Sequence, residues 1–242
     1  MEPGFNELQF AYGCTRELED GTWFIPPLGI PYFPTLYKEK ILGYDVAFPG
    51  LVAPVFLQYK VAHYMKRTSA REYSLFGGPY FRFKIYPATR SPQHNQLVAL
   101  ARKQPFVFYC APGFAEYQAY QNLHRDKKIA QHSVFFPCSF LPQNSGNDVH
   151  NIVYTINPPI SYWCSEPIEI KSIVGWNGLV EYCYTLETVF DKLPNIINHL
   201  EELLHLDNLG SNNQYLMLER LYKIINAVME RYCLALGFLR KQ

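Results

Sequence analysis

A run of six apolar residues, Phe106–Ala111, constrains the fold of this chain more than any other stretch of its sequence. Pro105 precedes the run and Pro112-Gly113 follows it. A short apolar run between residues that break secondary structure predicts a strand buried on both faces of a sheet. Such a strand needs a covering layer on each face, which favours an α/β fold with helices flanking the sheet.

The elements before this strand are predicted in the order helix, strand, strand, strand, helix. The first helix is predicted at residues 5–20. The three strands are predicted at residues 40–48, 54–64 and 79–86. Ser91 and Pro92 suit the start of the second helix, because serine is a favoured N-cap and proline fits the first helical position. A helix that follows a three-strand meander and leads back to a buried strand should place that strand in the same sheet. The sequence therefore predicts one mixed sheet.

Three polar residues are expected to meet in the stretch Gly43–Lys60, which reads as two strands around a Pro/Gly turn. Asp45 belongs to the first strand, and Gln58 and Lys60 to the second. Side chains alternate along a strand, so Gln58 and Lys60 project on one side and Tyr59 on the other. A hairpin would fold this pair back toward Asp45. A carboxylate, an amide oxygen and an ammonium would then converge, as a seat for a hard divalent cation beside a polarising lysine requires.

The overall composition indicates a globular protein with a large core. Of its 242 residues 48% are apolar, and the net charge is only +1, so nucleic-acid binding would need a local basic patch. No apolar run approaches the roughly 18–20 residues that span a membrane. The N-terminal residues lack the pattern of a secretory signal, and the six cysteines show no CxxC pair. We therefore expect reduced thiols and a cytoplasmic location.

The chain is predicted to have two parts. Residues 1–180 would form the α/β domain, including an ordered, ring-packed loop at 22–37. Residues 181–242 would form a C-terminal helical hairpin packed on it, because leucine and isoleucine recur at helical spacing over 186–206 and 214–239. The hairpin is expected to be either part of the core or a dimer surface. The hairpin and the aromatic loop are the expected contacts for a protein partner or a second copy of the chain.

This element order, with Asp45 on the first strand and Gln58 and Lys60 on the second, resembles the PD-(D/E)XK, restriction-endonuclease-like nuclease superfamily, over roughly residues 5–112. Glutamine in the place of the second acid is similar to the Gln-x-Lys variant of the Mrr-like branch. The resemblance implies that Asp45 and Gln58 bind the metal and that Lys60 orients the attacking water and stabilises the charged transition state. The competing interpretation makes Gln58 and Lys60 the solvated face of a half-exposed strand.

The implied metal is Mg²⁺ or Mn²⁺. Because the Gln58 carbonyl is a neutral ligand, the site lacks one negative charge and should bind Mg²⁺ more weakly than an all-carboxylate site. In the superfamily a carboxylate on the first helix usually compensates. Glu17 and Glu7 are the candidates, and Glu17 is preferred because it lies closer to the strand in sequence.

Basic residues with interleaved aromatics between positions 60 and 94 are the candidate surface for DNA. Phosphates attract such cations, and exposed rings stack on bases. The candidates are Lys66, Arg67, Arg71, Arg82, Lys84, Arg90 and His94. His94 belongs to the polar run Gln93–Gln96 at the start of the second helix, where it would contact a phosphate or carry a proton. The alternatives are a solvated basic face and an ordinary polar first turn.

The expected function is Mg²⁺-dependent cleavage of DNA, of the kind found in prokaryotic defence or restriction systems. The alternative is a catalytically inactive, nuclease-like binding or scaffold subunit of a larger defence or repair assembly. Other hydrolase and nucleotide-binding motifs, such as Gly-x-Ser-x-Gly, are missing from the sequence.

Overall fold

The structure is a computed structural model, and it describes residues 1–20, 30–49 and 54–185. The chain divides into two compact units, Met1–Cys183 and Tyr184–Gln242. The predicted C-terminal hairpin at 186–206 and 214–239 lies outside the described residues, as does the first half of the aromatic loop, residues 22–29.

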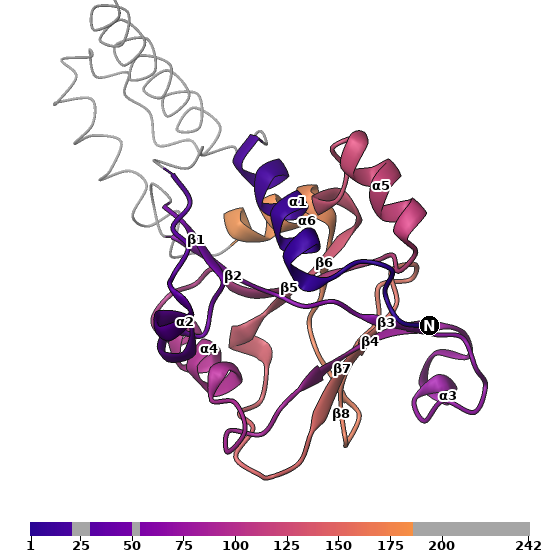
Figure 1. The fold of residues 1–242 in the computed structure, drawn as a ribbon. Coiled ribbons are helices and arrows are strands. Elements are labelled where there is room, and N and C mark those ends of the chain that lie inside the picture. The colour runs from indigo at the N-terminus through magenta and orange to yellow at the C-terminus, as the bar shows by residue number, and fades with distance from the viewer. Residues whose placement is uncertain (21–29, 50–53, 186–242) are drawn as a thin grey trace, which may run out of the picture. The chain divides into compact units, whose positions relative to one another are not determined.

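Two five-stranded sheets form the framework of the first unit (Figure 1). The first sheet has the order β1-β2-β5-β6-β10, in which β2 and β5 are parallel and all other neighbours antiparallel. Its strands are β1 (Val46–Phe48), β2 (Val55–Tyr59), β5 (Val107–Pro112), β6 (Ser133–Pro137) and β10 (Ile173–Val174). All six residues of β5 are buried, as the apolar run predicts.

The second sheet has the order β3-β4-β7-β8-β9 and is antiparallel throughout. Its strands are β3 (His63–Met65), β4 (Tyr80–Ile85), β7 (His150–Tyr154), β8 (Ser161–Cys164) and β9 (Ile168–Glu169). Strand β3 begins four residues after β2 ends, so the chain passes directly from one sheet into the other. The prediction of a single sheet was wrong on this point, because the alternation in 79–86 indicates a half-buried strand without showing which strand it pairs with.

Helices cover both faces of the first sheet (Figure 1). Helices α1 (Glu7–Asp20) and α6 (Gly175–Thr185) lie on one face, where Phe10 contacts Tyr59 of β2 and Tyr182 contacts Phe108 of β5. Helix α4 (Gln93–Ala101) lies on the other face, against β5 and beside α2 (Leu36–Leu42). The other helices in the described part of the chain are α3 (Tyr73–Phe76), α5 (Tyr117–Arg125), η1 (Ala130–His132) and η2 (Cys138–Phe140). The predicted α/β class, with helices flanking a mixed sheet, is confirmed.

The predicted strand at 40–48 is shorter than expected, because its first half belongs to α2. The hydroxyl of Thr35 accepts a hydrogen bond from the Lys38 amide and so caps the helix start. Gly43 ends the helix with a left-handed φ of 86° and donates its N–H to the Glu39 carbonyl. The strand begins only at Val46, which leaves Asp45 directly before it.

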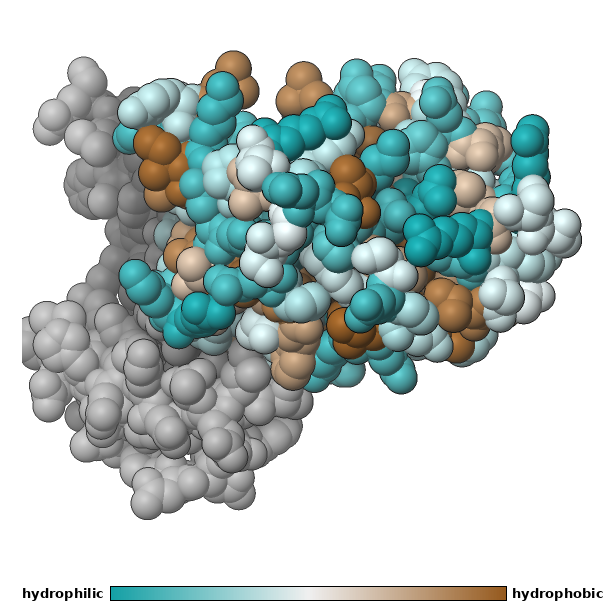
Figure 2. All heavy atoms as spheres, turned by 90° about the horizontal axis from the view of Figure 1, so that it is seen from below, coloured by the Kyte–Doolittle hydropathy of each residue, from teal (hydrophilic) through white to brown (hydrophobic). Residues whose placement is uncertain are grey.

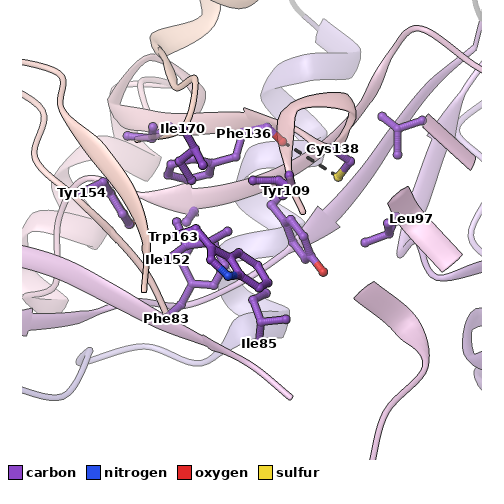
Figure 3. Close-up of a cluster of buried hydrophobic side chains, with 14 of the residues drawn as sticks. Phe83, Ile85, Leu97, Tyr109, Phe136, Cys138, Ile152, Tyr154, Trp163 and Ile170 are labelled. Carbon is purple, nitrogen blue, oxygen red and sulfur yellow. Dashed lines mark hydrogen bonds between the residues drawn. The ribbon is translucent and has the colours of Figure 1, made fainter. Parts of the chain in front are cut away.

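A large hydrophobic core packs between the two sheets (Figure 3). Phe83 of β4 contacts Tyr109 of β5 and Phe136 of β6, with ring centroids 5.8 and 5.7 Å apart. Tyr154 of β7 packs against Phe136 at 5.1 Å and donates its hydroxyl to the Pro112 carbonyl. These aromatic contacts fix the angle between the sheets and therefore the position of the β2–β3 junction.

The outer surface is mixed in character. On the described part of the face shown in Figure 2, hydrophobic side chains lie singly or in small groups among hydrophilic ones. A search of the described residues found no helix with the length and hydropathy needed to cross a membrane.

Candidate active site at the end of strand β2

Asp45 and Gln58 lie opposite each other because of the register between β1 and β2. Val46 pairs with Leu57, and the Asp45 amide donates to the Leu57 carbonyl. Asp45, one residue before Val46, therefore faces Gln58, one residue after Leu57. The Gln58 side-chain amide donates to Asp45 Oδ2 at 2.8 Å, and the Tyr59 backbone N–H donates to the same oxygen at 2.8 Å. The predicted convergence of the carboxylate and the amide is therefore present in the structure.

Gln93, the first residue of α4, joins this pair to Lys60. Its side-chain N–H donates to Gln58 Oε1 at 2.9 Å and to Glu39 Oε1 at 3.4 Å. The side-chain oxygen of Gln93, Oε1, accepts a hydrogen bond from Lys60 Nζ at 3.4 Å. Gln58 and Lys60 thus project on the α4 side of β2, while Tyr59 points to Phe10 of α1, as strand alternation predicts.

Glu7 is the α1 carboxylate that reaches this point. Its Oε1 lies 3.8 Å from Lys60 Nζ, and the two side chains are 44% and 18% exposed. Glu17, the preferred candidate from the sequence, lies elsewhere: its Oε2 accepts from the Ala130 backbone N–H at 2.7 Å, at the start of η1. Distance along the sequence misled the choice, because residues ten apart on a helix lie about 15 Å apart along its axis and project in different directions.

We call Glu7, Glu39, Asp45, Gln58, Lys60 and Gln93 the Asp45 cluster. Burial raises the pKa of Asp45 from its ordinary 3.8 to about 7. The Tyr59 N–H and the Lys60 ammonium oppose this rise in the pKa, and the carboxylates of Glu7 and Glu39 add to it. The cluster therefore holds Asp45 at the edge of ionisation near neutral pH, where a nearby cation would shift it to the charged form.

Two clefts open onto the cluster, and both include Glu7 in their walls. The first, with a volume of about 360 Å³, is also lined by Lys60, His63, Lys84 and Gln93, among others; we call it the basic cleft. The second has a volume of about 740 Å³. We call it the aromatic cleft, and its lining includes Tyr12, Phe33, Glu39 and Asp45. A ligand in either cleft would reach the cluster.

The donor atoms of the cluster suit Mg²⁺ in type, since carboxylate and amide oxygens are the ligands that hard cations prefer. Within the described residues no group of three or more His, Cys, Asp and Glu side chains lies close enough together to hold a metal. The donors are instead paired with one another, and Gln58 turns its N–H groups toward Asp45. For Gln58 to present its oxygen to a cation beside Asp45, its amide would have to flip, and Gln93, whose N–H now donates to Gln58 Oε1, would have to turn with it.

His94 lines the basic cleft, but both of its ring nitrogens are hydrogen-bonded within the protein. Its ring is 3% exposed, and its nitrogens bond the Tyr109 hydroxyl at 3.1 Å and the Pro142 carbonyl at 2.8 Å. Burial lowers the pKa of His94 to about 4, so the ring is neutral at physiological pH. A neutral ring with both nitrogens engaged anchors α4 to β5 rather than attracting a phosphate.

Of the other predicted DNA-contacting residues, two border the basic cleft. Lys84 lines it, and Arg90 stacks its guanidinium 3.9 Å over the ring of Tyr86, another lining residue. The remaining four do not line either cleft in the described part of the chain. Arg82 pairs with the buried Glu72 at 3.3 Å and Lys66 with Glu116 at 3.9 Å, while Arg67 and Arg71 are exposed.

Two members of the cluster were not identified as site residues from the sequence. Gln93 stands in the polar first turn of α4, which was a usable signal. Glu39 gave no signal in the sequence, because it lies in the short helix α2 that hydrophobic periodicity does not reveal.

Comparison of the chain with protein-family models, curated proteins and solved structures gave no match.

Proposed function

We propose that the Asp45 cluster hydrolyses phosphodiester bonds of DNA with the help of Mg²⁺ or Mn²⁺. The observation that carries the proposal is the meeting of Asp45, Gln58 and Lys60 at the end of one strand, beside two open clefts. Two features of the topology support the proposal: β1 is antiparallel to β2, and α4 leads into β5 parallel to β2. The third strand of the expected order, β4, belongs to the other sheet. In the PD-(D/E)XK superfamily the same residue types in the same order form the catalytic site.

Each member of the cluster has a distinct task in this reaction. Asp45, Gln58 and Glu7 would hold the cation, which would polarise the phosphate and lower the pKa of the attacking water. Lys60 stabilises the negative charge that develops on the phosphate, because its ammonium borders the basic cleft. Gln93 positions both Gln58 and Lys60 through its two hydrogen-bonding groups. Glu39 holds Gln93 in turn.

A second candidate function, nucleic-acid binding without cleavage, is favoured by one observation. The carboxylates of the cluster are not grouped in a cage, and the Gln58 amide donates to Asp45 instead of presenting its oxygen. In this alternative the hydrogen-bonded cluster is purely structural. The two clefts would then bind a strand that is cut elsewhere or not at all.

A nicking assay separates the two candidates. Supercoiled plasmid and single-stranded circular DNA are incubated with the protein and Mg²⁺ or Mn²⁺, with EDTA as the blank. We expect metal-dependent cleavage that falls by about 100- to 1,000-fold in Lys60→Ala, the range for loss of one group that stabilises transition-state charge. Lys103→Ala is the matched control, because Lys103 is an exposed lysine that lines neither cleft.

Equal inertness of the wild type and Lys60→Ala on both DNA forms with both metals would remove the catalytic proposal. Binding of DNA by that inert protein would then support the second candidate. Equal cleavage by both proteins would assign the reaction to other residues.

A further inference from the structure

The two clefts beside the Asp45 cluster differ in chemistry. The basic cleft contains the ammonium groups of Lys60 and Lys84 together with His63. The aromatic cleft has apolar walls from Tyr12, Phe33 and neighbouring aliphatic side chains. It also carries the carboxylates of Glu7, Glu19, Glu39 and Asp45 against a single cation, Arg16. A phosphate is attracted by the first charge pattern and repelled by the second.

The rings in the aromatic cleft are available to a ligand. Tyr12 is 59% and Phe33 is 60% exposed, although most aromatic residues of the described chain are wholly or partly buried. A cleft of about 740 Å³ lies within the size range of small-molecule sites, about 300–1,000 Å³. It therefore has room for a planar, uncharged group that is rich in π-electrons, such as a nucleobase.

Glu7 lines both clefts, Lys60 lines only the basic one and Asp45 only the aromatic one. The cluster thus stands where the two clefts adjoin. A nucleotide with its phosphate at Lys60 and its base toward Tyr12 and Phe33 matches the charge and polarity on each side. The base of an intact duplex cannot enter such a cleft, because it is paired and stacked inside the helix.

We propose that the Asp45 cluster acts on single-stranded DNA, whose phosphate lies in the basic cleft while an adjoining unpaired base stacks in the aromatic cleft. This inference rests on the proposed function and adds the class of substrate. Tyr12 and Phe33 are then binding residues, and Lys84 attracts the backbone on the opposite side of the cluster.

Binding measured in EDTA tests the inference without cleavage. Fluorescence anisotropy compares a labelled oligo(dT), the same strand in a blunt duplex, and the same strand with abasic sites in place of its bases. We expect the wild type to bind oligo(dT) at least about 10-fold more tightly than either other probe. Because base stacking on one aromatic ring contributes about 1–3 kcal/mol, Phe33→Ala and Tyr12→Ala should each weaken oligo(dT) binding by about 5- to 150-fold.

Tyr117→Ala is the matched control, since Tyr117 is a 47% exposed aromatic on α5 that lines neither cleft. It should leave binding unchanged, and Phe33→Trp should preserve the preference for oligo(dT). Thermal unfolding checks that each variant folds, which the exposure of these rings favours. Duplex bound as tightly as oligo(dT), abasic strand bound as tightly as oligo(dT), or full binding by both alanine variants would each overturn the inference.

The two proposals fail in different ways. Ring-dependent binding of oligo(dT) by a protein that cuts nothing with Mg²⁺ or Mn²⁺ would refute hydrolysis and leave the single-strand site standing. Lys60-dependent nicking of plasmid with no ring-dependent preference for single strands would refute the single-strand site and leave hydrolysis standing.

Discussion

Replacing Asp45 by asparagine should stabilise the protein above neutral pH. The substitution keeps an oxygen that can accept from Gln58 and Tyr59, which both donate to Asp45 Oδ2. It removes a charge that the fold accommodates poorly, since burial raises the pKa of Asp45 from 3.8 to about 7. The unfolded chain bears that charge without this penalty.

The pKa difference sets the magnitude of this effect. A rise of about three pKa units corresponds to about 4 kcal/mol between the charged and neutral forms in the folded state. Because the folded-state pKa exceeds the unfolded one, the contribution of Asp45 to stability falls as pH rises from about 4 to about 7 and then levels off. Asp45→Asn should therefore match the wild type near pH 4 and exceed it by about 2–4 kcal/mol at pH 8.

Urea unfolding at several pH values between 4 and 8 measures this difference directly. Gln121→Ala is the control, because Gln121 is exposed on α5 and has no ionisable group, so its effect should not change with pH. Mg²⁺ at pH 8 should stabilise the wild type and leave Asp45→Asn unchanged, because ligands stabilise only the form that binds them. A difference between Asp45→Asn and wild type that stays constant with pH, or destabilisation at pH 8, would refute the assigned environment of Asp45.

Three further predictions concern the framework around the cluster. Since burial lowers the pKa of His94 to about 4, the stability of the wild type relative to His94→Gln should fall by about 3 kcal/mol as pH falls from about 6.5 to 4, measured by urea unfolding of both proteins. Phe10→Ala should cost about 3–5 kcal/mol in the same assay, because Phe10 is fully buried against Tyr59; a loss below about 1 kcal/mol would contradict this packing. Thr15→Val should lower the free energy of unfolding by about 1–3 kcal/mol, because it leaves the buried Tyr59 hydroxyl unpaired. Adding Tyr59→Phe should recover part of this loss. No recovery would argue against the 2.8 Å hydrogen bond between Thr15 and Tyr59.

The sequence predicted those parts of the site that depend on strand alternation. Gln58 and Lys60 project on one side because they are two residues apart, and the short connection to Asp45 restricts the register. The apolar run 106–111 likewise predicted a strand buried on both faces, which β5 is. These features follow from local geometry, which the order of residues determines.

The remaining parts of the site depend on contacts between distant segments. The choice between Glu7 and Glu17 is decided by what each side chain reaches from α1: Glu7 lies beside Lys60, whereas Glu17 accepts from the Ala130 amide at η1. The separation of β4 from the first sheet depends on its pairing with β7, which follows it by more than sixty residues. Periodicity within a segment carries no information on such pairings.

The parallel pairing of β2 with β5 sets an order in which the cluster can assemble. Asp45 and Gln58 are close in the sequence, so their contact needs only a short loop to close. Gln93 reaches them only after β3, β4 and α4 have been synthesised and β5 has paired with β2. A growing chain therefore contains the carboxylate and the lysine well before the residue that links them. We expect completion of the cluster to coincide with closure of the core between the two sheets, a late step of folding.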